Sequence, residues 1–166
     1  ICPQTAPCFV IQLTPNSKII MSNPIVIQPY LFFGGNCEEA LEFYQAALGA
    51  EIDMIMRYKD APEQPPEGML APGYENKVMH AGFRVGSAVV MASDGCGEAC
   101  AFGGFALSLS LENAAACEKA FTALTEGGEV KMPLGETFWS PCFGMVQDKF
   151  GVLWMITVAE CSLPSA

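Results

Sequence analysis

The sequence predicts an α+β fold in which two paired βαβββ modules form a half-open β cup. Each half of the chain reads as a strand, a helix and three further strands. The two predicted helices superpose with an offset of about 78 residues, and a glycine follows each of them. Because one such unit cannot bury its sheet face alone, the two must pair, and their inward faces then line the cup.

The first module is predicted to open with a strand at 25–33, which is rich in β-branched and aromatic residues. Asn36 is then expected to cap a helix at 37–48, with Glu39 as the return partner of a capping box. Gly49 suits the left-handed position that ends a helix. The module's remaining strands are expected at 51–58, 78–85 and 87–92.

Two loops and the second module complete the chain. Residues 59–76 are rich in proline and glycine without periodicity, which is typical of a lid or binding loop. Residues 94–104 form a second, glycine-rich loop. The second module is predicted to contain a strand at 105–111, a helix at 113–126 and strands that begin at 129–132 and span 138–147 and 152–158.

Residues 1–20 do not resemble the rest of the chain. They lack the basic region and continuous apolar segment of a signal peptide, and an ordinary start follows at Met21. They are interpreted as a non-native or flexible N-terminal extension, dispensable for folding of 24–158, or alternatively as an arm that pairs with a sheet edge. The expected organisation is an extension at 1–20, modules at 21–92 and 93–160, and a tail at 161–166.

Composition excludes several classes of partner. The net charge is −10, and eight Lys and Arg residues are scattered, so we expect no nucleic-acid binding. No apolar stretch suits a membrane-spanning helix, so we expect no membrane partner. The acidic balance suits either solubility or a cationic ligand. Hydrophobic residues make up 51% of the chain, which indicates a large core, a subunit interface, or both.

The eight cysteines form no CxxC pair, and most stand singly in apolar stretches. Reduced cysteine behaves there as a small hydrophobic residue. A chain of this length needs no disulfides, so the sequence indicates a reducing compartment, and we expect a cytoplasmic protein.

Several stretches together resemble a known superfamily. They are QPYLFF at 28–33, EA at 39–40, FY at 43–44, LG at 48–49, ETFW at 136–139 and DKFGVLWMI at 148–156. From about 24 to 158 the chain resembles the glyoxalase/bleomycin-resistance (vicinal oxygen chelate) superfamily. Within it, the chain is similar to the PhnB-like subgroup, once labelled demethylubiquinone methyltransferase-like. The resemblance implies the cup fold and a homodimer whose interface borders the cup, with loop 59–76 as the reaching element.

The resemblance also implies where active members of the superfamily hold a divalent metal through His and Glu side chains. The side chains at those positions are poor ligands or no ligands for such a metal. They are Gln28 or Pro29, Ala106 or Leu107, Met155, and Arg84 in place of a further Glu. We therefore expect no bound metal and no cofactor.

The candidate catalytic residues are His80, the single histidine, and Glu136, which stands beside aromatic residues. Alternation along the strand places His80, Gly82 and Arg84 on one face. The alternatives are a structural, hydrogen-bonded histidine and a solvated loop-end carboxylate. The full set of candidate ligand-binding residues is Gln28, Tyr30, Phe32, His80, Arg84, Phe138, Trp139 and Met155.

Two functions remain open. The first is a metal-free protein that binds a small organic molecule in the cup. The second is a divergent lyase, isomerase or dioxygenase-like enzyme that uses His80 and Glu136. No GxGxxG loop, P-loop or nucleophile elbow occurs in the sequence, and nothing in it supports a methyltransferase.

Overall fold

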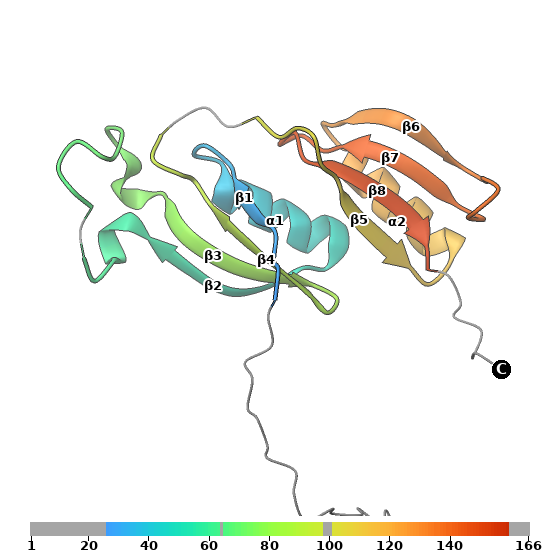
Figure 1. Cartoon of the computed structure of the whole chain (residues 1–166), viewed down its shortest axis with the longest axis horizontal. Coiled ribbons are helices and arrows are strands. Elements are labelled where there is room, and N and C mark those ends of the chain that lie inside the picture. Colours follow the sequence, from blue (N-terminus) through green and yellow to red (C-terminus); the bar gives the residue numbers. More distant parts are fainter. Residues whose placement is uncertain (1–25, 64, 98–100, 160–166) are drawn as a thin grey trace, which may run out of the picture.

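The computed structural model describes residues 26–63, 65–97 and 101–159. It contains two four-stranded sheets with the strand orders β1-β4-β3-β2 and β5-β8-β7-β6, which confirms the predicted α+β fold (Figure 1). The first module contains β1 (Tyr30–Phe32), α1 (Cys37–Leu48), β2 (Glu51–Arg57), β3 (Val78–Val85) and β4 (Ala88–Ser93). The second contains β5 (Leu107–Leu111), α2 (Ala114–Thr125), β6 (Glu129–Gly135), β7 (Phe143–Gln147) and β8 (Leu153–Val158).

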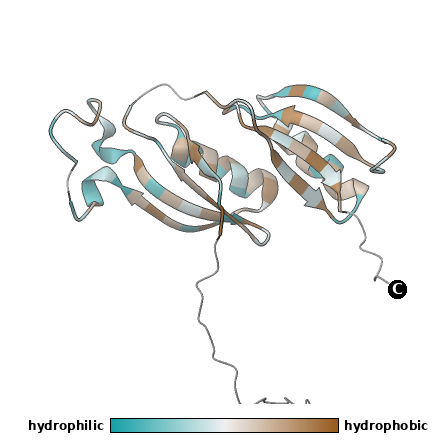
Figure 2. Ribbon diagram, in the orientation of Figure 1, coloured by the Kyte–Doolittle hydropathy of each residue, from teal (hydrophilic) through white to brown (hydrophobic). Residues whose placement is uncertain are grey.

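Each sheet has one face against a helix and one face open. The edge strands β1 and β5 pair in parallel with β4 and β8, and all other pairs are antiparallel. Helix α1 packs on β2 and β3, helix α2 packs on all four strands of its sheet, and the two helices contact each other. Apolar residues, brown in Figure 2, recur along the strands of both sheets. The faces turned away from the helices are called the open faces below.

The two sheets repeat the same irregularity. In the first, one extra residue lies between Ile52 and Met54, which pair with consecutive residues of β3. In the second, one extra residue lies between Val130 and Met132, which pair with consecutive residues of β7. Both pairs are related by an offset of 78 residues, so the bulges align the two sheets residue by residue.

Two of the predicted strands extend well beyond the observed ones. The strand expected at 25–33 is ordered as β1 over three residues only. Before it, Ile27 is 95% exposed. This β-branched residue, which suggested a strand, is therefore not buried in a sheet here. The strand expected at 138–147 begins at Phe143. The preceding residues form a turn in which the amide of Ser140 donates to the hydroxyl of Thr137, and that turn leaves Phe138 exposed.

The predicted capping box at the start of α1 is wrong. Asn36 makes no side-chain capping bond, and Glu39 forms an ion pair with Lys149 instead. The cap comes from Asp94, whose Oδ1 accepts hydrogen bonds from the amides of Gly35 (2.9 Å) and Cys37 (2.7 Å). A carboxylate distant in sequence therefore replaces the local cap. At the second helix, Asn113 does cap, because its side chain accepts a hydrogen bond from the amide of Ala116.

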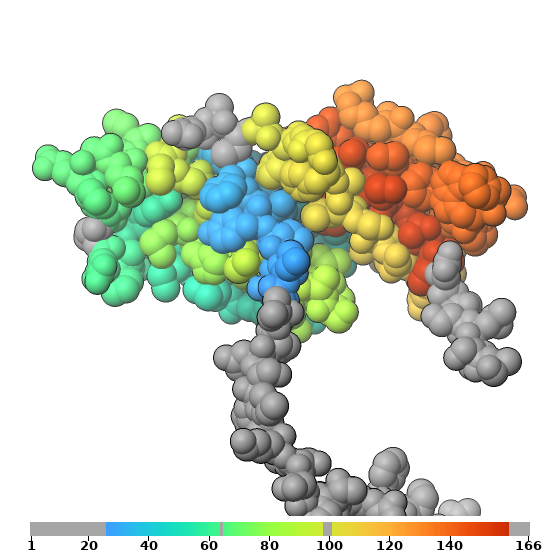
Figure 3. Space-filling model, in the orientation of Figure 1, coloured from blue at the N-terminus to red at the C-terminus, as the bar shows by residue number. Residues whose placement is uncertain are grey.

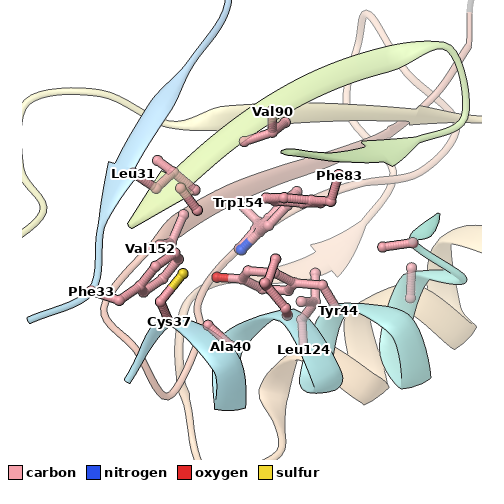
Figure 4. Packing of buried hydrophobic residues seen from close by; sticks show 14 of the residues in the cluster. Leu31, Phe33, Cys37, Ala40, Tyr44, Phe83, Val90, Leu124, Val152 and Trp154 are labelled. Atoms are coloured by element: carbon pink, nitrogen blue, oxygen red, sulfur yellow. The ribbon is translucent and has the colours of Figure 1, made fainter. Parts of the chain in front are cut away.

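One hydrophobic core spans both modules. At its centre the hydroxyl of Tyr44 donates to Asp148 Oδ2 (2.7 Å), and the indole nitrogen of Trp154 donates to the same oxygen (2.8 Å). Figure 4 shows the polar atoms of Tyr44 and Trp154 pointing into this part of the core. Burial, and then the charge of Asp148, raises the pKa of Tyr44 well above its ordinary value, so the hydroxyl remains a donor.

Among the described residues, four cysteines are free. They are Cys37, Cys96, Cys117 and Cys142; the other four lie outside the described residues. Burial, with the neighbouring carboxylates of Asp94 and Glu38, raises the pKa of Cys37 to about 12. The thiol of this core residue is therefore protonated and poorly nucleophilic at neutral pH.

The long loop at 59–76 is more ordered than its composition predicts. Short 3₁₀ turns occupy Tyr58–Asp60 and Tyr74–Asn76 at its ends. It is tied to the segment after β4, because the amide of Ala71 donates to the carbonyl of Cys96.

Among the described helices, none has the length and apolar character needed to cross a membrane.

Candidate ligand-binding site

The open face of the first sheet carries most of the candidate residues of the first module. Along β3, Ala81 and Phe83 are fully buried, whereas the residues that alternate with them face outward. This confirms the alternation predicted from the sequence. The open face of the first sheet includes Tyr30, Phe32, Met54, Met56, His80, Gly82, Arg84, Val89 and Met91.

An aromatic group lies at the β1 edge of this face. The hydroxyl of Tyr30 is 3.1 Å from Nδ1 of His80, and their ring centroids are 5.7 Å apart. The ring of Phe32 lies 4.9 Å from that of Tyr30. The described hydrogen bonds use Nδ1 of His80 only, so Nε2 remains available to a ligand. The structure therefore brings three of the predicted site residues together.

A cavity of about 500 Å³ adjoins this aromatic group. It is lined by residues of β1, blue in Figure 3, and by residues within 95–96 and 101–105 of the segment that joins the two modules, yellow in the same view. Its lining is mostly apolar and consists of Tyr30, Phe32, Gly95, Cys96, Ala101, Phe102 and Phe105. The volume is sufficient for a small organic molecule.

Tyr58 supports the wall of this cavity. Its hydroxyl donates a hydrogen bond of 2.7 Å to the carbonyl of Gly95. Burial, and then the neighbouring thiol of Cys96, raises the pKa of Tyr58 to about 12. Since the phenol is neutral at physiological pH, it adds no charge to the apolar lining.

Arg84 is not free to attract an anionic ligand. Its guanidinium contacts Asp53 (3.0 Å) and Glu51 (2.8 Å). The hydrogen bond and charge of Asp53, and then the charge of Glu51, raise the pKa of Arg84 above its ordinary value. This end of the open face is therefore neutral to acidic.

The second sheet carries the other predicted aromatic residues. Trp139 packs against Phe143, with ring centroids 5.7 Å apart, and against Phe138 at 4.3 Å. Trp139 and Phe143 border a hollow of about 370 Å³ with residues of β5 and β8. Met155 lies on the open face of this sheet, paired in register with Met145. Phe138, Trp139 and Phe143 therefore form an aromatic group beside the second sheet, whereas Tyr30 and His80 lie on the first.

The two remaining candidate residues are Glu136 and Gln28. Glu136 is exposed after the end of β6, and no described hydrogen bond or ion pair joins it to His80. The predicted catalytic pair is therefore not assembled by contacts within the described part of the chain. Gln28 is half-buried in the extended segment that precedes β1.

The residues at the positions where the resemblance implies metal ligands do not fit a metal. Leu107 packs against the hydrophobic core, Met155 offers only a soft thioether, and Arg84 is held by two carboxylates. Within the described residues no cluster of three His, Cys, Asp or Glu side chains is placed to hold an ion. The side chains at these positions therefore support no reaction step that passes through a metal ion.

Sequence reasoning named Met155 but missed the other methionines of the open faces. Met54, Met56 and Met91 lie on the first sheet, and Met132 and Met145 lie on the second. The alternating EIDMIMR pattern of β2 was the available signal, since it places Met54 and Met56 on one face. The aromatic rings of Phe102 and Phe105 were also missed, since Phe102 lies in the loop at 94–104 and Phe105 was assigned to a strand that in fact begins at Leu107.

Comparison with known proteins identifies close relatives. The family model for 3-demethylubiquinone-9 3-methyltransferase matches residues 25–157. Protein YjdN of Escherichia coli is 37% identical over 143 residues, which cover 81% of this chain and 95% of that protein. The crystal structure of protein PA1353 from Pseudomonas aeruginosa is 40% identical with a TM-score of 0.71, covering 81% of this chain and 98% of that one.

A more distant structure shares the fold. The glyoxylase/bleomycin resistance protein/dioxygenase domain from Frankia is 15% identical with a TM-score of 0.57, covering 84% of this chain and all of that domain. The chain therefore belongs to the family described as 3-demethylubiquinone-9 3-methyltransferase, the PhnB-like family, and has the glyoxalase/bleomycin-resistance fold.

Proposed function

We propose that this protein binds a small organic molecule, without a metal, at the open face of the first sheet. The observation that carries the proposal is the aromatic group of Tyr30, Phe32 and His80 beside an apolar cavity of about 500 Å³. A largely apolar pocket with a few convergent polar groups is the usual form of a small-molecule site. Here the imidazole supplies the polar contact.

The described residues give no support to binding of a methyl-donor cofactor at α1. Nucleotide-type cofactors place an anionic or polar group at the amides that open a helix. In this chain the amides of Gly35 and Cys37 already donate to Asp94, whose carboxylate is buried. A second acceptor at that helix end would face the negative charge of Asp94, which disfavours it.

The hydrogen bond between Tyr30 and His80 favours a second candidate function, a divergent enzyme of the same superfamily. An imidazole held at Nδ1 by a phenol can transfer a proton through Nε2. Glu136 has no described contact that places it opposite His80. The binding function therefore has the stronger support, because it requires only the side chains that the structure brings together.

Binding is tested by thermal shift of untagged protein against a metabolite and drug library. A ligand of the native state raises the unfolding midpoint by mass action. We expect hits whose shift falls in Phe32→Ala and His80→Ala but not in the distant control Glu129→Ala. Elemental analysis of the same protein should find no stoichiometric Zn, Ni, Mn or Fe. A metal removed by His80→Ala, or turnover of a hit that requires His80, would favour the enzyme instead.

We further propose that two copies pair with their interface beside the site. Tyr30, Phe32, Met54 and Met132 are large apolar side chains that a single chain leaves exposed on its open faces. A two-fold dimer is the commonest way to cover such surface. Sedimentation at micromolar concentration is expected to give about twice 17.8 kDa. A monomer throughout that range would contradict the pairing and leave the binding proposal intact.

A further inference from the structure

Nothing in the described structure requires a glycine at position 82. Gly82 lies in the middle of β3 on the open face of the first sheet, paired with Met54 of β2 and Met91 of β4. Its backbone φ angle is not positive, so its conformation is open to other residues. A Cβ added there would meet only Met54 Cγ, at an ordinary 3.8 Å. Glycine weakens the interior of a strand, so neither backbone conformation nor packing accounts for it.

Gly144 of β7 shows what a structurally required glycine looks like. A Cβ at that position would approach Leu134 and Phe121 to 2.9 Å, closer than real Cβ atoms come. Gly144 therefore permits close packing within the second module. No such neighbour surrounds Gly82.

The second module fills the position that Gly82 leaves open. Because both sheets carry the same bulge, the row Tyr30, Met91, Gly82, Met54 aligns with the row Ser108, Met155, Met145, Met132. Two of the four positions are methionine in both modules, at β4 and β8 and at β2 and β6. Met145 occupies the position in the second sheet that corresponds to Gly82. The fold therefore accommodates a large side chain at this position.

We infer that Gly82 keeps a ligand-contact position open, and that a flat aromatic or heteroaromatic ring lies on its backbone between Met54 and Met91. This inference rests on the proposed binding function and names the class of ligand. Thioethers contact aromatic rings favourably and adapt to their shape. Tyr30 stands in the same row as Gly82 and also lines the cavity, so this row reaches the cavity at Tyr30.

The charges around the position define the ligand further. Arg84 follows on the same face, but Glu51 and Asp53 hold its guanidinium, which leaves no free cation for an anionic ring. His80 precedes Gly82 on that face and offers Nε2 for one hydrogen bond. The expected ligand is therefore an uncharged planar ring with one hydrogen-bonding substituent.

The test uses the neutral fluorescent probe N-phenyl-1-naphthylamine, which carries aromatic rings and one N–H group. We expect saturable fluorescence enhancement with wild-type protein and an affinity about tenfold or more lower in Gly82→Ala. The unfolding midpoint of Gly82→Ala should equal or exceed that of the wild type, because alanine is favoured over glycine at a conformation both can adopt. Gly135→Ala is the matched control, since its Cβ would meet nothing within 4 Å.

The possible outcomes separate this inference from the binding function itself. Loss of probe binding with retained stability in Gly82→Ala, and unchanged binding in Gly135→Ala, supports the inference. Probe affinity within about threefold of wild type in Gly82→Ala overturns it while leaving the binding function in place. A lower midpoint in Gly82→Ala also overturns it, because the glycine is then structural. If wild-type protein binds neither the probe nor any library compound, the proposed function itself fails.

Discussion

Replacement of Asp148 by alanine is expected to lower the free energy of unfolding by about 4 kcal/mol, because it leaves several buried donors without an acceptor. Asp148 is 3% exposed. Its Oδ2 accepts from Tyr44 and Trp154, and its Oδ1 accepts from the amides of Phe150 and Val152. The carboxylate thus joins α1 of the first module to the turn before β8 of the second, and its loss should loosen both.

Urea denaturation of Asp148→Ala and Asp148→Asn measures this effect. Asparagine retains an acceptor for the amides but turns an N–H toward the indole donor of Trp154, so we expect an intermediate loss. Glu129→Ala is the control, since its ion pair with Lys131 is exposed and its removal should change the free energy of unfolding by no more than about 1 kcal/mol. A loss in Asp148→Ala as small as that of the control would refute the role assigned to the network.

Asp94→Ala is expected to cost about 3 kcal/mol, because three backbone amides lose their acceptor. Oδ1 caps the start of α1 through Gly35 and Cys37, and Oδ2 accepts from the amide of Val78 at 2.8 Å. Asp94 is almost fully buried, so water cannot readily replace the carboxylate. The same substitution should loosen the cavity wall, since Gly95 and Cys96 follow directly in the chain.

Hydrogen exchange distinguishes this cap from a general loss of stability. In Asp94→Ala the amides of Cys37 and Val78 should lose more protection than amides in β7 of the second module. Asn36→Ala is the informative control, because the conventional capping position makes no side-chain bond here. If Asn36→Ala destabilised the chain more than Asp94→Ala, the assignment of the cap to Asp94 would be wrong.

Local sequence signals accounted for the elements whose causes are local. The helix at 37–48 was predicted at its observed limits, because its apolar residues recur at helical spacing and Gly49 adopts the left-handed conformation after it. The hairpin of β3 and β4 and the outward direction of His80 followed from alternation. The offset of 78 residues between the halves agrees with the register of both bulges.

The errors arose where a distant residue replaced a local one. Asn36 and Glu39 had the pattern of a capping box, yet Asp94 supplies the cap and Lys149 attracts Glu39. Nothing within four residues of Asn36 signals a carboxylate 58 positions away. Likewise, Phe138 has a high propensity for β-strands. It lies instead in the turn closed by Thr137 and Ser140, and β7 begins only at Phe143.

By itself, the sequence determined the order of elements, the repeat, and the face on which each strand residue lies, because these depend on spacing along the chain. Only the tertiary structure decided which of the candidate side chains lie in contact. It placed Tyr30 against His80 across two strands, neutralised Arg84 with two carboxylates, and kept the aromatic group of Trp139 on the other sheet. Those relations depend on strand order and register, which bring together residues far apart in the chain, such as Tyr30 and His80 at a separation of 50 positions.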